Sequence, residues 1–331
     1  MTESTRSEAR VNTVLGPVPA TELGIVAVHE ALLSVVPGAQ FAPDITIDRA
    51  EVFDILAGKL RAFRECGGGT LVDSTGMFHG RDLSLYEALS RSTGVHVVAS
   101  TGLGPEEMLG GYFLTPQTNP PTPWPADRFA DLFTKEVTEG MVVPRLERRA
   151  LAGLVATAAD HGGMTPVEES LFRGAARTAL ATGIPVSLRY GADATAELDI
   201  VLDEGLAADR VVVSGLDRRD ATDAGAALEV ARRGAYVGID HVGSTDGDHV
   251  TDEDRADLVR GLVDAGHADR ILLSCNAVGV AKGHPDTDVS YSLLIEFVRE
   301  LEEAGLADAT RRLLVDNPRE LLSVRPAAVG E

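Results

Sequence analysis

The chain has 331 residues, of which 30 are lysine or arginine and 51 are aspartate or glutamate, giving a formal net charge of −21. This acidic balance excludes a nucleic-acid binder, which needs a basic face to displace counterions. It also argues against adsorption to anionic membranes. The hydrophobic content of 44% is typical of a globular protein with a substantial core.

Neither a membrane span nor a secretion signal is evident in the sequence. No apolar run approaches the roughly 20 residues of a spanning helix, and residues 1–14 lack the apolar centre of a signal peptide. The two cysteines, Cys66 and Cys275, are too few for a disulfide framework. We therefore expect a cytoplasmic protein.

Short apolar runs rich in β-branched residues alternate with helical patterns along the chain. The predicted strands cover 24–29, 69–74, 95–100, 150–158, 184–190, 210–215, 235–240 and 270–275. The predicted helices lie near 47–66, 82–93, 126–139, 165–183, 194–206, 220–233, 252–266, 290–305 and 307–324. Asp48 is a candidate N-cap, and Pro166 falls in a first helical turn. The Pro- and Gly-rich stretch 102–125 is too long for an ordinary connection and indicates a functional loop.

Eight apolar strands, each followed by a helix or a long loop, predict a parallel sheet buried on both faces. This number of units favours a single α/β domain of the (β/α)₈ TIM-barrel type over an open doubly wound sheet. No G-x-G-x-x-G follows the first strand, which weakens the dinucleotide-binding alternative. We expect an N-terminal extension (1–20), the barrel (21–306), and C-terminal helices with a tail (307–331).

Active sites of such barrels lie at the C-terminal ends of the strands. The side chains there that carry chemistry come mainly from strands one and five to eight. They are His29, Glu30, Asp73, Thr157, Arg189, Tyr190, Ser214, Asp240, His241, Cys275 and Asn276.

Several segments of the sequence resemble the phosphotriesterase-like family, within the amidohydrolase superfamily. The resemblance lies in residues 11–32, 70–103, 183–189, 238–242 and 313–322 and runs through the chain in one register. It implies a TIM barrel and a homodimer.

The resemblance also implies a two-metal centre, in which two divalent cations activate a bridging water and polarise the substrate. Its ligands in the family are a His-x-His pair on strand 1, a carboxylated lysine on strand 4, histidines on strands 5 and 6, and an aspartate on strand 8. Only His29, the first of these, is present here. The other positions hold Ala31, Thr157, Arg189, Gly215 and Asn276. We therefore expect a divergent member with no metal centre and no cofactor.

Arg189 introduces a fixed positive charge where the family has a metal ligand. A guanidinium binds carboxylates and phosphates in a bidentate manner. We expect Arg189 to anchor a small anionic molecule, with Asn276, Thr157 and Tyr190 also in the substrate-binding site. The structural alternative is an ion pair of Arg189 with Asp217 or Asp240.

Without a metal hydroxide, a histidine beside carboxylates is the natural proton-transfer group. We expect His29, Asp240 and His241 to be catalytic; Glu30 and Asp73 are weaker candidates. The alternatives are that His29 only holds strand 1 and that Asp240 and His241 tie loops together. The acidic stretch 243–254 is expected to be a solvated loop.

Three functions remain open from the sequence. The first is a metal-independent enzyme that acts on a small carboxylate-bearing metabolite by acid–base chemistry, as a hydrolase, lyase or cyclase. The second is a catalytically inactive pseudoenzyme that binds a ligand or a partner. The third is a zinc-dependent lactonase or phosphotriesterase.

Overall fold

The computed structural model describes residues 9–39, 42, 45–109, 114–115, 122–143, 147–223, 225–283 and 289–326. The described chain opens with a hairpin of β1 (Arg10–Thr13) and β2 (Gly16–Pro19), followed by one 3₁₀ turn, η1 (Ala20–Glu22). Val11, Ala20 and Leu23 from this segment pack into the inner apolar cluster of the barrel. The hairpin therefore closes the end of the barrel opposite the strand C-termini, and the sequence pattern did not predict it.

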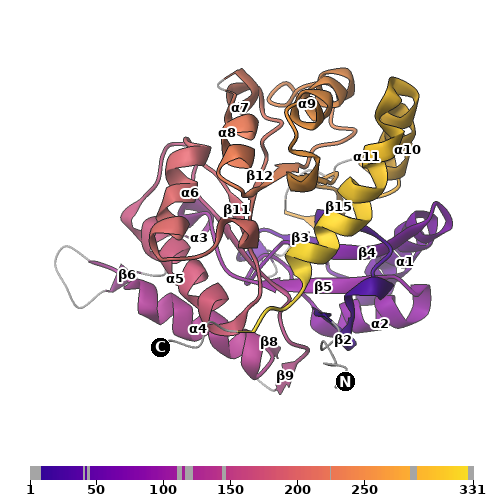
Figure 1. Ribbon diagram of the computed structural model, residues 1–331. Helices are drawn as coiled ribbons and strands as arrows, with labels where there is room; N and C mark the ends of the chain where they lie inside the picture. The colour runs from indigo at the N-terminus through magenta and orange to yellow at the C-terminus, as the bar shows by residue number, and fades with distance from the viewer. Residues whose placement is uncertain are drawn as a thin grey trace, which may run out of the picture.

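Nine strands in the described part of the chain form one parallel sheet (Figure 1). They are β3 (Ile25–Val35), β4 (Gly68–Asp73), β5 (His96–Thr101), β10 (Leu154–Ala158), β11 (Val186–Arg189), β12 (Val211–Ser214), β13 (Tyr236–Ile239), β14 (Ile271–Leu273) and β15 (Val278–Lys282). The sheet order is β14-β13-β12-β11-β10-β5-β4-β3-β15.

The two edge strands, β14 and β15, are consecutive in the chain and are separated only by residues 274–277. β14 pairs with β13 and β15 pairs with β3, so together they act as the eighth barrel strand and close the ring. The predicted (β/α)₈ barrel is therefore confirmed, with its last strand broken at the end where chemistry is expected.

Helices cover the outside of the sheet (Figure 1). The principal ones are α1 (Arg49–Glu65), α2 (Leu83–Thr93), α4 (Ala126–Thr138), α5 (Pro166–Thr182), α6 (Ala194–Asp203), α8 (Ala226–Arg232), α9 (Asp252–Asp264) and α10 (Leu293–Leu301). Shorter helices are α3 (Glu106–Leu109), α7 (Arg219–Asp223), α11 (Ala307–Arg311) and α12 (Asn317–Leu322). Two short hairpins, β6 (Leu114–Thr115) with β7 (Thr122–Pro123) and β8 (Met141–Val143) with β9 (Glu147–Arg149), lie between β5 and β10.

Local sequence signals explain where the helices begin. Asp48 accepts hydrogen bonds from the N–H groups of Ala50 and Glu51, as its N-cap position predicted. Thr165 and Glu168 form a capping box at the start of α5, with Pro166 in the first turn. No described helix is long and apolar enough to span a membrane.

Alternation along the strands divides the core into two layers. Inward positions such as Val28, Val72, Leu154 and Leu272 form the inner cluster along the barrel axis. The intervening positions, such as Val155, pack against the helices in the larger outer cluster. This alternation decides which strand-end side chains reach the mouth of the barrel.

Candidate functional site

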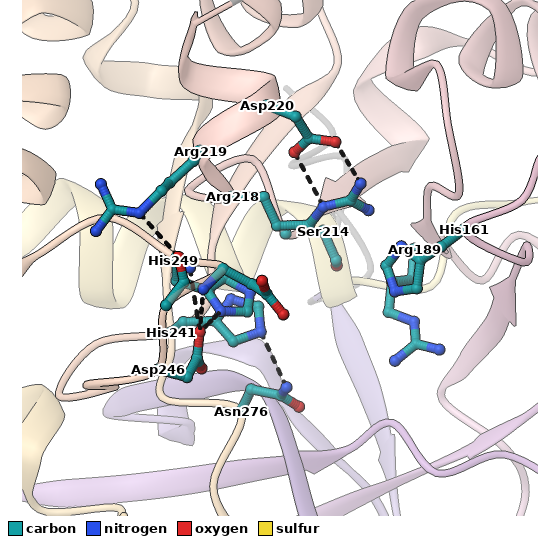
Figure 2. A pocket seen from close by; sticks show the side chains of 13 residues that line it. His161, Arg189, Ser214, Arg218, Arg219, Asp220, His241, Asp246, His249 and Asn276 are labelled. Carbon is teal, nitrogen blue, oxygen red and sulfur yellow. Dashed lines mark hydrogen bonds and ion pairs between the residues drawn. The ribbon is translucent and has the colours of Figure 1, made fainter.

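A cavity of about 590 Å³ opens at the C-terminal ends of the strands (Figure 2). Its wall is polar and carries three arginines, three aspartates and three histidines. It is lined by His161, Arg189, Ser214, Gly215, Arg218, Arg219, Asp220, His241, Asp246, Gly247, Asp248, His249 and Asn276. The structure thus brings together three of the predicted site residues, namely Arg189, His241 and Asn276.

His241 follows β13 and is held by a carboxylate from the neighbouring strand end. Its Nδ1 lies 2.9 Å from Oδ1 of Asp217, and its backbone N–H donates to Oδ2 at 2.9 Å. Its Nε2 lies 3.1 Å from Nδ2 of Asn276. Asp217 accepts at Nδ1 and the Asn276 amide donates at Nε2, so the proton of the neutral imidazole belongs on Nδ1. Nε2 is then the ring atom that can accept a further proton, in exchange for its contact with Asn276.

Asp217 is fully buried, and so is Arg255, whose Nε donates to Asp217 Oδ2 at 2.8 Å. Hydrogen bonds and charge from His241 and Arg255 hold the pKa of Asp217 well below its usual range, against the opposing effect of burial. Asp217 is therefore a permanent anion that orients His241. The sequence offered no signal for Arg255, which lies in the first turn of α9, or for this pairing.

Arg189 ends β11 and points into the cavity (Figure 2). Its guanidinium forms no hydrogen bond or ion pair with any residue in the described ranges, so neither Asp217 nor Asp240 is its partner. Burial, followed by the nearby charge of Arg218, lowers its pKa. An arginine nevertheless remains charged at neutral pH. The more distant charges of Glu107 and Asp160 oppose the lowering of this pKa without forming an ion pair with Arg189. A partly desolvated cation with no ion-pair partner among the described residues is a ready site for an anion.

His29 lies behind the cavity and is not among the residues that line it. An irregularity in the pairing of β3 with β4 between Ala27 and Glu30 turns His29 toward the barrel axis, where its Nδ1 lies 3.2 Å from Ser214 Oγ. Burial and, secondarily, the charge of Arg189 lower the pKa of His29 to about 3. His29 is therefore a neutral hydrogen-bonding group and a weak base.

Asp240 is also buried beneath the cavity. Its Oδ2 accepts from the N–H of Gly215 at 2.7 Å, while Oδ1 has no partner among the described residues. Burial and then the charge of Asp217 raise its pKa well above the usual value. Asp240 therefore tends to carry a proton, and the carboxylate that serves His241 is Asp217 instead of its sequence neighbour.

Thr157 and Tyr190, predicted to contact the ligand, do not line the cavity. Leu154 faces inward and Val155 outward, so alternation turns Ala156 toward the barrel axis and Thr157 away from it. The inward positions on strand 4 are thus Ala156 and Ala158, one on each side of the predicted residue, and Ala158 pairs with Arg189 in the sheet. Tyr190 supports the wall from below, with its ring 4.2 Å from the Arg218 guanidinium.

Glu30 and Asp73 bind backbone groups within the barrel wall. Glu30 accepts from Ser274 Oγ and from the N–H groups of Cys275 and Ala277, and burial raises its pKa to about 7. Asp73 accepts from the N–H of Leu32 at 2.8 Å. Both carboxyls hold strand ends in place and neither lines the cavity.

The donor set does not fit the two-metal centre that the resemblance implies. Strand 4 supplies Ala156 and Ala158 to the barrel axis, and strands 5 and 6 supply Arg189 and Gly215 to its mouth. None of these side chains can ligate a cation. Gly215 has φ +83°, and Asn276 has φ +46°, so the backbone at two former ligand positions is left-handed. No group of three or more His, Cys, Asp or Glu side chains in the described ranges could hold a metal ion.

The stretch 243–254 contributes to the site, although it was expected to be only a solvated loop. Asp246, Gly247, Asp248 and His249 form one wall of the cavity. The His249 ring lies 3.6 Å from the His241 ring, centroid to centroid, with 23° between their planes. A histidine in an acidic loop gives no sequence signal for such stacking, because the contact depends on how the loop folds back.

The fold and the site define a (β/α)₈ barrel whose cavity lies at the strand C-termini, the usual position of an active site in this architecture. The family model described as Phosphotriesterase family matches residues 9–322. The chain therefore belongs to the phosphotriesterase family, as the resemblance predicted.

Curated relatives span nearly the whole chain. A phosphotriesterase homology protein from Mycobacterium tuberculosis (strain H37Rv) is 27% identical over 327 residues, covering 94% of this chain and 97% of the relative. An aryldialkylphosphatase from Saccharolobus solfataricus is 26% identical over 260 residues, covering 78% of each chain. An N-acetyltaurine hydrolase from Salmo salar is 23% identical over 361 residues, covering 96% and 98%. The family thus includes hydrolases.

One similar solved structure comes from molecular engineering of organophosphate hydrolysis activity from a weak promiscuous lactonase template. It superimposes with a TM-score of 0.80 at 23% identity, covering 95% of this chain and 100% of that one. At this identity the likeness establishes the shared barrel fold.

Proposed function

We propose that this protein hydrolyses a small anionic, carboxylate-bearing molecule without a resident metal. Arg189 holds the anionic group, and His241, oriented by Asp217, transfers the proton. The observation that carries the proposal is the coexistence, in one cavity, of an unpaired guanidinium and a carboxylate-held imidazole.

Binding is assigned to Arg189 because its guanidinium has no direct ion-pair partner within the described ranges. A carboxylate accepts two parallel N–H bonds from a guanidinium, and this pairing is strongest where water is excluded. Asn276 lines the same cavity and offers an amide next to His241. Tyr190 contributes indirectly, by supporting Arg218.

The proton transfer is assigned to the Nε2 atom of His241. Nε2 takes a proton from water as the water oxygen bonds to the acyl carbon, and then returns that proton to the departing oxygen or nitrogen. Asp217 stabilises the imidazolium that forms between these two steps. Hydrolysis is favoured over lyase or cyclase chemistry because related proteins bear hydrolase names.

A second candidate function is a ligand-binding barrel without turnover. The observation in its favour is that two of the three expected catalytic residues, His29 and Asp240, lie outside the cavity lining. His29 is also a weak base. A binding barrel would still hold the anion through Arg189. The two candidate functions differ in whether His241 transfers a proton.

A pair of chromogenic esters separates the two candidates. We expect 4-nitrophenyl hemisuccinate, which carries a carboxylate, to be hydrolysed with a higher kcat/KM than neutral 4-nitrophenyl butyrate. The variant His241→Ala should lower kcat by about 10²- to 10⁴-fold, while succinate still raises its Tm.

Binding of succinate by the wild type without hydrolysis of the hemisuccinate would favour the binding barrel. Hydrolysis that persists in His241→Ala at the wild-type rate would contradict the assignment of the proton transfer.

A further inference from the structure

His249 lies face to face with the imidazole that the proposed function uses. The two rings are 3.6 Å apart, and both side chains are 14% exposed. Each ring is held at Nδ1 by its own carboxylate, His241 by Asp217 at 2.9 Å and His249 by Asp246 at 2.7 Å. Figure 2 shows the two rings stacked at the cavity wall.

The loop that carries His249 is held by hydrogen bonds on both sides of this residue. The side-chain Nε of Arg219 donates to Gly247 O at 3.0 Å, and its backbone N–H donates to Asp248 O at 3.0 Å. The backbone N–H of Val250 donates to Asp217 O at 3.1 Å. These hydrogen bonds to the main chain of the loop hold the His249 ring over His241, and they do not involve either imidazole.

We propose that His249 is a positioning residue for His241: its ring covers one face of the His241 imidazole and helps to fix the orientation in which Nδ1 faces Asp217 and Nε2 faces Asn276 at the cavity. This inference rests on the proposed function for its catalytic meaning. Its structural content is independent of turnover.

The physical reason is that the two ring contacts of His241, with Asp217 at Nδ1 and Asn276 at Nε2, act at the ring edge and leave both faces uncovered. The terminal torsion of a histidine is broad and roughly two-fold, so such a ring can still rock. A flat neighbour at stacking distance restricts that rotation and removes water from one face. Proton transfer depends steeply on such orientation, because a displacement of about 1 Å can lower a rate by about 10²-fold. A planar ring is therefore required at position 249, whereas its titratable nitrogen is not.

The test compares His249→Ala, which removes the ring, with His249→Phe, which keeps a flat ring and removes the nitrogen. Long-range ¹H–¹⁵N spectra of the full chain report the tautomer of each imidazole. We expect His241 to be an Nδ1–H tautomer in the wild type and in His249→Phe, and a mixture of tautomers in His249→Ala. His267→Ala, which deletes an imidazole outside the cavity, is the matched control and should leave the His241 signals unchanged.

Hydrolysis of 4-nitrophenyl hemisuccinate gives a second readout. We expect His249→Ala to lower kcat by about tenfold with little change in KM, and His249→Phe to restore it. Unchanged His241 tautomers in His249→Ala would overturn the inference, as would an equal disturbance in His249→Phe. If the wild type does not hydrolyse this ester, the proposed function fails for this probe. The spectra still decide whether His249 orients His241.

Discussion

Oδ1 of Asp217 lies 2.9 Å from Nδ1 of His241, although 24 positions separate the two residues in the chain. The same carboxylate binds the fully buried Arg255 through its other oxygen. Asp217 therefore both orients the proposed base and neutralises a buried cation, and these two roles can be separated by measurement.

Replacement of Asp217 by Asn should destabilise the fold because Arg255 loses its fully buried anionic partner and keeps only the more exposed Asp252. Removing one partner of a buried ion pair costs about 3–5 kcal/mol. Since the pKa of Asp217 is lowered in the folded state, its contribution is complete above its ordinary pKa of 3.8 and is lost as the pH falls below that value. Urea unfolding should show a large difference from wild type at pH 7 that shrinks toward pH 3. A difference that is independent of pH would contradict this assignment, and Asp248→Asn serves as an exposed control.

Asp240 should respond in the opposite way to the same amide substitution. Its raised pKa means that folding favours the protonated form, so its contribution is full below pH 3.8 and declines as the pH rises toward the folded-state pKa. Asp240→Asn should therefore gain stability relative to wild type as the pH rises above 3.8, and it should retain hydrolysis of the hemisuccinate. Loss of hydrolysis in this variant would show that Asp240 is itself a proton-transfer group.

Arg189 should be a functional residue that lowers stability. Arg189→Met removes a poorly solvated charge without a partner, and we expect it to unfold at higher urea concentration, with a gain of about 1 kcal/mol. The same variant should lose the stabilisation of the wild type by succinate. Arg189→Lys, which keeps the charge but not the bidentate geometry, should show an intermediate effect. Succinate binding in Arg189→Met equal to that of the wild type would remove Arg189 from the site.

Restoring a histidine at position 215 should not rebuild a metal ligand. Gly215 has φ +83°, a conformation in which a side chain costs about 1–2 kcal/mol. Space is not the obstacle, because a Cβ there would meet its nearest neighbour, Tyr190 Cε1, at 3.8 Å. Gly215→His and Gly215→Ala should therefore be destabilised to a similar extent in urea unfolding. Wild-type stability in both variants would contradict a backbone origin for the missing ligand.

Most of the fold could be predicted from the sequence because it depends on local periodicity. A near-continuous apolar run and a capping residue such as Asp48 or Thr165 each determine the structure of the few residues next to them. The prediction failed where structure depends on distant contacts. The strand expected over 150–158 begins only at Leu154, and the helix expected over 220–233 is two helices, α7 and α8.

The site could be predicted only in part. Their position at strand ends was sufficient to predict that Arg189, His241 and Asn276 belong to the site, and the three residues line the same cavity. The inward positions on strand 4 required the register of the sheet, and the sequence alone pointed to Thr157, which lies between the inward residues Ala156 and Ala158. The partners Asp217 and Arg255 could not be paired from the sequence because their contact joins a strand end to a helix 38 residues away.

We propose that the guanidinium of Arg189 takes the place of a bimetallic centre in this barrel. The most direct test is the metal content of the full-length protein, expressed with added zinc, purified without chelator and measured by inductively coupled plasma mass spectrometry. The account predicts far less than one metal ion per chain and succinate binding that survives dialysis against EDTA. Two zinc ions per chain, with binding lost on chelation, would contradict it.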